Sequence, residues 1–147
     1  MSNKFLSSED EKLIVEAIKN AELATSGEVR LHIEKKCKID PIERAQQVFG
    51  KLKMHKTQQR NGVIVYVATE DHKVVIWGDE GIHNKVGQNF WEEELALMIS
   101  SFKQEAYAEG IAKAINDIGG KLKEHYPYQE DDVNELPDDI SYGDDDA

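Results

Sequence analysis

A six-residue run, Val63 to Ala68, is the feature that most constrains the fold of this chain. The run reads VIVYVA, so a strand built from it would be apolar on both faces. Such a strand has to be covered on each side, which is typical of a central strand in a sheet that carries helices on both faces. We therefore expect this run to form the middle of the sheet.

Helical patterns precede and follow this run. The first helix is expected to begin at Ser7 or Ser8, where SEDE reads as a capping box. Asp40, followed by proline and a glutamate three residues on, predicts the start of a second helix. A third helix is expected from Asn89, and a fourth over about residues 105 to 123. The apolar stripes expected to be buried are Leu13, Ile14, Ala17, Ile18 and Ala21; Ile42, Ala45, Phe49 and Leu52; Trp91, Leu95, Met98 and Phe102; and Tyr107, Ile111, Ile115, Ile118 and Leu122.

Two further strands are expected beside the central one. Residues 29 to about 36 alternate apolar and polar side chains, which indicates a strand with one wet face. The helix that follows returns the chain to its starting edge, so this strand should run parallel to the central one. The short loop TEDHK predicts that residues 74 to 77 run back antiparallel. The predicted fold class is therefore α/β, a three-layer α/β/α sandwich with a small mixed sheet and helices on both faces.

The 147 residues are enough for one domain, and their charge is unevenly distributed. The formal net charge is -11, but residues 127–147 hold nine acidic residues and no lysine or arginine. We expect an α/β domain over residues 1–126 and an acidic C-terminal tail over 127–147. The rest of the chain is close to neutral, which argues against a nucleic-acid partner.

The tail also carries apolar residues that are able to hold it against the domain. These are Val133, Leu136, Ile140 and Tyr142. A cluster of basic residues offers a docking surface, which gives the hypothesis of intramolecular docking. The cluster consists of Lys35, Lys36, Lys38, Lys51, Lys53, Lys56 and Arg60.

Compartment and assembly are predicted from what the sequence lacks. A single cysteine, Cys37, forms no internal disulfide, so an oxidising compartment is not required. The N-terminus has no apolar signal core, and no run approaches the roughly 20 apolar residues of a membrane span. We expect a cytoplasmic protein with no membrane span, and a monomer.

The stretch GDEG, residues 78 to 81, places two acids between two glycines at the end of a strand. With the strand directions above, Glu28, the pair Asn61-Gly62 and the acids Asp79 and Glu80 all lie at one end of the sheet. Carboxylates brought together repel unless a cation or proton intervenes, and oxygen ligands suit Ca²⁺ or Mg²⁺. Alternatively, the acids are ordinary loop residues and the glycines supply positive φ.

Other kinds of site are excluded by their spacing. No Gly-Lys-Ser/Thr follows the glycines, so there is no phosphate-binding loop of the P-loop type. The five histidines include no pair at i and i+4, which argues against zinc. The tail segment Asp138 to Gly143 fails the EF-hand pattern, and no serine or cysteine has the context of a catalytic nucleophile.

Four segments in order, TSGEVRLHIEKK, RNGVIVYVA, IWGDEGIHNKVG and FKQEAYAEGIAKAI, resemble the TPM domain family over about residues 5 to 124. The family's loop glycines match Gly78 and Gly81, its Asn-Gly matches Asn61 and Gly62, and a helix glycine matches Gly110. The resemblance implies an α/β/α sandwich, divalent cation binding in some members, and a phosphatase designation carried by many relatives.

Two departures limit what the resemblance implies. Many relatives carry a signal peptide and a C-terminal membrane segment, which this chain lacks. The downstream acid of the family's loop is also missing, since no acid follows Glu80 until Glu92. The leading hypothesis is a Ca²⁺ or Mg²⁺ site formed by Glu28, Asp79 and Glu80.

Two functions remain open for such a site. One is metal-assisted hydrolysis of a phosphate ester, with Arg60 or His83 neutralising substrate charge. The other is a non-catalytic module that uses the cation for local order and binds a protein partner. The sequence does not decide whether the domain is catalytic.

Overall fold

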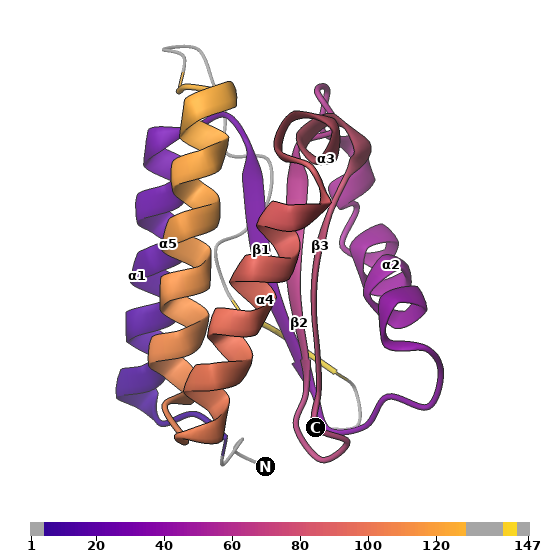
Figure 1. Cartoon of the computed structure of the whole chain (residues 1–147), viewed down its shortest axis with the longest axis vertical. Coiled ribbons are helices and arrows are strands. Elements are labelled where there is room, and N and C mark those ends of the chain that lie inside the picture. The colour runs from indigo at the N-terminus through magenta and orange to yellow at the C-terminus, as the bar shows by residue number, and fades with distance from the viewer. Residues whose placement is uncertain (1–4, 129–139, 144–147) are drawn as a thin grey trace.

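The structure, a computed structural model, describes residues 5–128 and 140–143. Five α-helices, one short 3-10 helix and four strands follow one another over these residues (Figure 1). The helices are α1 (Ser8–Ala24), α2 (Pro41–Lys51), η1 (Met54–Lys56), α3 (Glu80–Val86), α4 (Gln88–Lys103) and α5 (Tyr107–His125). The strands are β1 (Glu28–Glu34), β2 (Gly62–Ala68), β3 (Lys73–Gly78) and β4 (Ser141–Tyr142).

The apolar run forms β2, an inner strand of a sheet with the order β3-β2-β1-β4. Strand β1 pairs with β2 in parallel, with Glu28 opposite Gly62, and β3 pairs with β2 antiparallel, with Gly78 opposite Val63. Both predicted directions are therefore confirmed. Strand β4 extends the sheet in parallel with β1, and the sequence analysis did not predict it.

Helices cover both faces of the sheet, as Figure 1 shows. Helices α1, α4 and α5 lie on one side, where the odd-numbered residues of β2 enter the larger core cluster. Helix α2 lies on the other, where Ile64 and Tyr66 enter a second cluster with Phe49. The predicted three-layer α/β/α sandwich is confirmed. Within the described ranges, no helix combines the length and the apolar character that crossing a membrane requires.

Two helix starts follow from capping residues that the sequence indicated. Ser7 is the N-cap of α1 and exchanges capping-box hydrogen bonds with Asp10. Asp40 caps α2 and accepts hydrogen bonds from the Ile42 and Glu43 amides, with Pro41 in the first turn. These caps satisfy amides that have no partner within the helix.

The helix expected from Asn89 is α4, which begins at Gln88, but the sequence analysis missed a separate helix before it. A separate helix, α3, begins directly after Asp79, whose carboxylate accepts the Glu80 amide. Gly87, at φ 81°, then ends α3 and precedes α4. A residue in this left-handed region cannot continue a helix, and glycine adopts it without steric cost. The short helix α3 therefore places Asp79 as a cap rather than in an open turn.

Three burial predictions were wrong. Leu13 and Ile42, each assigned to a buried stripe, are exposed, because the buried faces of α1 and α2 are formed by other residues, such as Ile14 and Ala45. The polar face of β1, expected to be wet, is buried from Glu28 to Glu34. Packing of the layers, rather than the alternation of the strand, decided this burial.

Gly78 and Gly81 are required for space and not for positive φ, which neither adopts. A Cβ at Gly78 would lie 2.5 Å from the Trp91 ring. A Cβ at Gly81 would lie 2.1 Å from the carbonyl oxygen of Gln59 and 2.6 Å from that of Arg60. The explanation that these glycines supply positive φ is therefore wrong. Gly81 lets α3 contact the backbone of the loop that precedes β2.

Replacing Gly81 with alanine is expected to lower the free energy of unfolding by about 2 kcal/mol or more, because backbone carbonyls cannot move aside as side chains do. The matched control is Gly120→Ala in α5, where a Cβ meets nothing within 4 Å. That change should stabilise by about 0.5 to 1 kcal/mol through helix propensity. Urea denaturation of both variants measures the difference, and equal effects would contradict the close approach at Gly81.

Candidate functional site

The predicted rim lies at the end of the sheet where α3 is drawn in Figure 1. Glu28 is the first residue of β1, and its Cα lies opposite that of Gly62. Asp79 follows β3, and its amide donates to the Gly62 carbonyl at 2.9 Å. The structure thus brings both predicted acids to the same end of the sheet, on either side of Gly62. We call Glu28, Asn61, Asp79 and Glu80 the rim residues.

The pairing of β2 with β3 ends at Val63 and Gly78, and the hydrogen bond from the Asp79 amide to the Gly62 carbonyl extends it by one residue, so that Glu28, Gly62 and Asp79 form a row. Residues directly opposite each other on neighbouring strands project to the same face, and Gly62 puts no side chain between these two. Two strand spacings separate their backbones by roughly 10 Å. Two carboxylates can reach a common cation across such a distance, because each side chain extends several ångströms from its Cα.

Both acids of this row are almost completely buried. Glu28 is 4% exposed and Asp79 is 1% exposed. A carboxylate removed from water requires compensating charge or hydrogen bonds. Glu80 differs, since its side chain is 69% exposed and lies at the outer edge of the rim. Of the three predicted ligands, only Glu28 and Asp79 therefore have the burial typical of a built polar site.

Asp79 is held by Arg60 through a bidentate ion pair. Arg60 Nε donates to Asp79 Oδ2 at 2.6 Å, and Nη2 donates to Oδ1 at 2.8 Å. Glu80 Oε1 lies 3.8 Å from Nη2. The carboxylate of Asp79 raises the pKa of the Arg60 guanidinium through its hydrogen bonds and its charge. The sequence analysis did not foresee this pair, although opposite charges just outside the paired ends of β2 and β3 could have indicated it.

Asn61 follows Arg60 in the sequence and directly precedes β2. It is 2% exposed, and its Oδ1 accepts no hydrogen bond within the described part of the chain. A buried amide oxygen of this kind is rare, because an unsatisfied acceptor costs about 1 to 3 kcal/mol. Across residues 5–128 and 140–143, no three His, Cys, Asp or Glu side chains form a group suited to a metal. Any cation at the rim would thus rely on two or three side-chain oxygens together with water.

A cleft of about 750 Å³ opens beside Asp79, along β3. Arg60, Asp79 and His83 all line it. Trp91 Nε1 donates to His83 Nδ1 at 3.0 Å, so the neutral imidazole carries its proton on Nε2. The cleft therefore combines a cation, a carboxylate and an imidazole N–H donor. The guanidinium and the imidazole N–H can together bind an oxyanion once Arg60 no longer donates to Asp79.

The buried face of β1 holds a second polar network, which sequence reasoning missed. Glu34 accepts two hydrogen bonds from Arg44, at 2.8 and 2.9 Å, and one from the Tyr66 hydroxyl. Burial by itself would raise the pKa of Glu34, but these hydrogen bonds outweigh it and hold the pKa at about 2. His32 lies beside Glu34, and burial lowers the pKa of its imidazole. The alternation of β1 marked these residues as polar but not as buried.

Strand β4 closes this network from the edge of the sheet. Ser141 Oγ lies 2.8 Å from His32 Nδ1, and the Gly143 amide donates to the Ile33 carbonyl at 2.9 Å. A hollow of about 530 Å³ lies here, lined in part by Ser141, Tyr142, Gly143, Lys36, Lys38 and Lys51. The structure therefore places residues 140–143 of the acidic tail against part of the predicted basic cluster. Val133 and Leu136, also predicted to pin the tail, lie outside the described residues.

A further carboxyl pair lies away from the rim, between α4 and α5. Burial raises the pKa of Glu94 to about 7, and the neighbouring Asp117 adds to the effect. Asp117 is in turn paired with Lys113 at 2.9 Å. The raised pKa of Glu94 thus arises first from burial and then from a second carboxyl nearby in the helix layer. Glu94 and Asp117 therefore do not belong to the rim residues.

Comparison with known proteins assigns the family. The family model described as the TPM domain matches residues 2–121. The chain belongs to the TPM domain family. Among curated proteins, none matches this TPM domain.

Solved structures share the fold. The NMR structure of BA42 protein from the psychrophilic bacterium Bizionia argentinensis is 43% identical, covers 97% of this chain and 99% of its own, and superposes with a TM-score of 0.89. The N-terminal domain of a P. gingivalis protein is 12% identical, with coverages of 86% and 83% and a TM-score of 0.67. The N-terminal domain of cg2496 protein from Corynebacterium glutamicum is 17% identical, with coverages of 80% and 74% and a TM-score of 0.63. At 12% and 17% identity, the last two support the fold alone.

The Glu34 network generates a prediction for acid stability. The pKa of Glu34 is depressed from 4.5 to about 2, so its stabilisation is fully present above the unfolded-state pKa. It is lost as the pH falls from about 4.5 towards 2, and amounts to about 2 to 3 kcal/mol. Glu34→Gln should lose a similar amount at pH 7 and show a flatter profile in this window. Urea denaturation between pH 2 and 7 measures both effects.

The matched control is Glu70→Gln, since Glu70 is an exposed glutamate shortly after β2. This variant should keep the pH profile of the wild type to within about 0.5 kcal/mol. A Glu34→Gln profile as steep as that of the wild type would show that other groups carry the acid sensitivity.

Proposed function

We propose that this TPM domain binds a divalent cation, Ca²⁺ or Mg²⁺, at the rim, with Glu28 and Asp79 as carboxylate ligands and Glu80 at the outer edge. The observation that carries the proposal is the row Glu28, Gly62, Asp79, which sets two buried acids on one face without an intervening side chain. A cation shared by two carboxylates whose backbones lie roughly 10 Å apart would offset the repulsion between them. Carboxylate and amide oxygens are also the ligands that these cations prefer.

Asn61 Oδ1, which accepts no hydrogen bond within residues 5–128 and 140–143, would be a further oxygen ligand for a hard cation. Its carbonyl oxygen is neutral, so it adds a donor without adding charge repulsion. The small number of side-chain oxygens means that water would complete the coordination, which both Ca²⁺ and Mg²⁺ tolerate. The residues present are therefore sufficient for a partly hydrated ion, and insufficient for a cage built from protein alone.

Phosphomonoester hydrolysis is the catalytic version of this proposal, and the shared cleft of Asp79, Arg60 and His83 favours it. A bound cation would supply positive charge that polarises a phosphate ester. Arg60 is suited to pair with phosphate oxygens, because its planar guanidinium offers two parallel donors. His83, with its proton on Nε2, would donate a hydrogen bond to the same group.

The alternative is a non-catalytic module in which the cation orders the ends of β1, β2 and β3 and the ordered surface binds a protein partner. The observation that favours it is the origin of the rim residues in separate segments, which backbone hydrogen bonds to the carbonyls of Asn61 and Gly62 join. A cation that links such segments stabilises them whether or not any reaction follows. The hydrolase and the interaction module use the same cation site, and only the hydrolase turns over a substrate.

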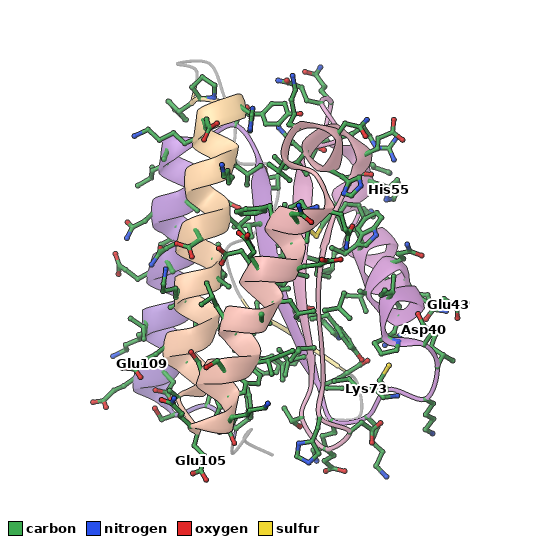
Figure 2. All side chains as sticks on the ribbon, in the orientation of Figure 1. Asp40, Glu43, His55, Lys73, Glu105 and Glu109 are labelled. Atoms are coloured by element: carbon green, nitrogen blue, oxygen red, sulfur yellow. The ribbon has the colours of Figure 1, made fainter. Side chains whose placement is uncertain are left out.

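Titration with Ca²⁺ and with Mg²⁺, followed by backbone amide shifts, tests the site. Shifts are expected at residues 27–29, 60–62 and 78–82. Asp79→Asn should weaken binding at least about tenfold, because a charged ligand is replaced by a neutral one. The control is Glu109→Gln, an exposed acid at the opposite end of the molecule (Figure 2), which should bind like the wild type.

Hydrolysis of an aryl phosphate in the same samples separates the two versions. Turnover that requires the cation and is lost in Asp79→Asn supports the hydrolase. Amide shifts without turnover favour the interaction module. Unchanged cation affinity in both Asp79→Asn and Glu28→Gln would contradict the rim site itself.

A further inference from the structure

We propose that Arg60 is a displaceable counterion: a cation that binds Asp79 releases the Arg60 guanidinium into the neighbouring cleft, where Arg60 and His83 bind an oxyanion. This inference rests on the proposed cation site and deepens it. It makes cation binding and oxyanion binding at this end of the sheet cooperative, although they use different side chains.

The first support is competition for the same oxygens. Arg60 donates one hydrogen bond to each carboxylate oxygen of Asp79, and the Glu80 amide donates a further one to Oδ1. A Ca²⁺ ion would have to approach to about 2.3 to 2.6 Å of the same oxygens, close to a guanidinium of like charge. The two positive charges repel each other at such distances, and the burial of Asp79 limits the screening by water on its side of the pair. Cation binding at Asp79 therefore requires the ion pair to open.

The second support shows which partner moves. The Asp79 side chain is 2% exposed, whereas that of Arg60 is 46% exposed. Asp79 is also fixed by its hydrogen bonds to the Glu80 amide and the Gly62 carbonyl. The guanidinium can turn towards water without losing a buried position. Opening the pair therefore displaces the side chain of Arg60 and leaves Asp79 in place.

The third support is the surroundings into which the guanidinium moves. Arg60 and His83 both line the cleft of about 750 Å³, and Trp91 fixes the proton of neutral His83 on Nε2. A freed guanidinium and an imidazole N–H are both donors, and neither is an acceptor. A phosphate-type oxyanion satisfies both, and its charge replaces that of Asp79 as the counterion of Arg60.

Cooperativity follows from this exchange. When Arg60 is bound to Asp79 it is unavailable to an anion, and when it is bound to an anion it leaves Asp79 open to a cation. Each ligand therefore favours the arrangement that the other needs, and the coupling has to be equal in both directions. A coupling of about five- to 100-fold in affinity is typical for two such sites.

A purely structural role for the ion pair predicts the opposite. In that case Arg60 anchors the loop before β2 to Asp79 and helps to shape the cation site. Its removal would weaken cation binding, and the guanidinium would stay on Asp79 in the cation-bound protein. The two roles thus differ in two measurable ways. Removal of the Arg60 side chain strengthens cation binding in one and weakens it in the other. The Arg60 Nε–H leaves Asp79 on cation binding in one and stays on it in the other.

The first measurement uses the wild-type chain. The Nε–H signal of Arg60, assigned by its absence in Arg60→Lys, is followed while Mg²⁺ is added. Displacement predicts a large shift of this signal and faster exchange with water, following the same binding curve as the rim amides. A signal that stays unchanged at saturating Mg²⁺ would overturn the inference. It would leave the cation site intact, because the amide shifts report that site independently.

The second measurement compares Mg²⁺ affinity in Arg60→Gln with that in the wild type. Removal of the competing charge should tighten binding at least about fivefold. The control is Lys113→Gln, which opens an ion pair with Asp117 remote from the rim and should leave Mg²⁺ affinity unchanged. Weaker Mg²⁺ binding in a folded Arg60→Gln variant would show that Arg60 supports the cation site, and equal binding would show that Arg60 has no effect on it. Either result would overturn the inference. If neither the wild type nor Arg60→Gln binds Mg²⁺ or Ca²⁺, both the proposed function and this inference fall.

The third measurement tests the coupling with inorganic phosphate. Phosphate should bind the wild type at least about fivefold more tightly at saturating Mg²⁺ than without it, and this gain should vanish in Arg60→Gln. An equal gain in both proteins would place the phosphate on the ion itself and overturn the role given to Arg60.

Discussion

The structure depends on the need to bury β2 on both faces. An apolar strand of this kind is stable only where a helix layer covers each side, so α2 and the layer of α1, α4 and α5 have to lie on opposite faces. The crossover through α2 makes β1 parallel to β2, while the short hairpin makes β3 antiparallel. These two directions bring the start of β1, the start of β2 and the end of β3 to one end of the sheet. The rim residues are adjacent for this reason alone.

Two buried acids inside the sandwich are neutralised by ion pairs with arginine. Glu34 is held by Arg44 and the Tyr66 hydroxyl, and Asp79 by Arg60. A buried ion pair seldom adds much net stability, because desolvation offsets the attraction, but the loss of one partner is costly. The two pairs differ in exposure: the Arg44 side chain is 24% exposed and that of Arg60 is 46% exposed. The first pair is therefore suited to a structural role, and the second can open at lower cost.

The family relation and the site answer different questions. The fold is shared with relatives that are only 12% and 17% identical, so it is set by the pattern of layers rather than by particular polar residues. Function is carried by sites placed on such folds. In the part of the chain that the structure describes, the site combines two buried acids and an arginine that neutralises one of them. In the function proposed for it, the chemistry of this site depends on whether Arg60 or a cation is bound to Asp79.

The sequence by itself determined the layers, the strand directions and the end of the sheet where the acids lie. Each of these follows from local patterns, namely the apolar run of β2, the cap at Asp40 and the short hairpin. Only the tertiary structure decided that Glu28 and Asp79 are buried, that Arg60 pairs with Asp79, and that β4 joins the sheet. The reason is that burial and pairing depend on which surfaces meet in three dimensions. A one-dimensional pattern of polar and apolar residues does not contain that information.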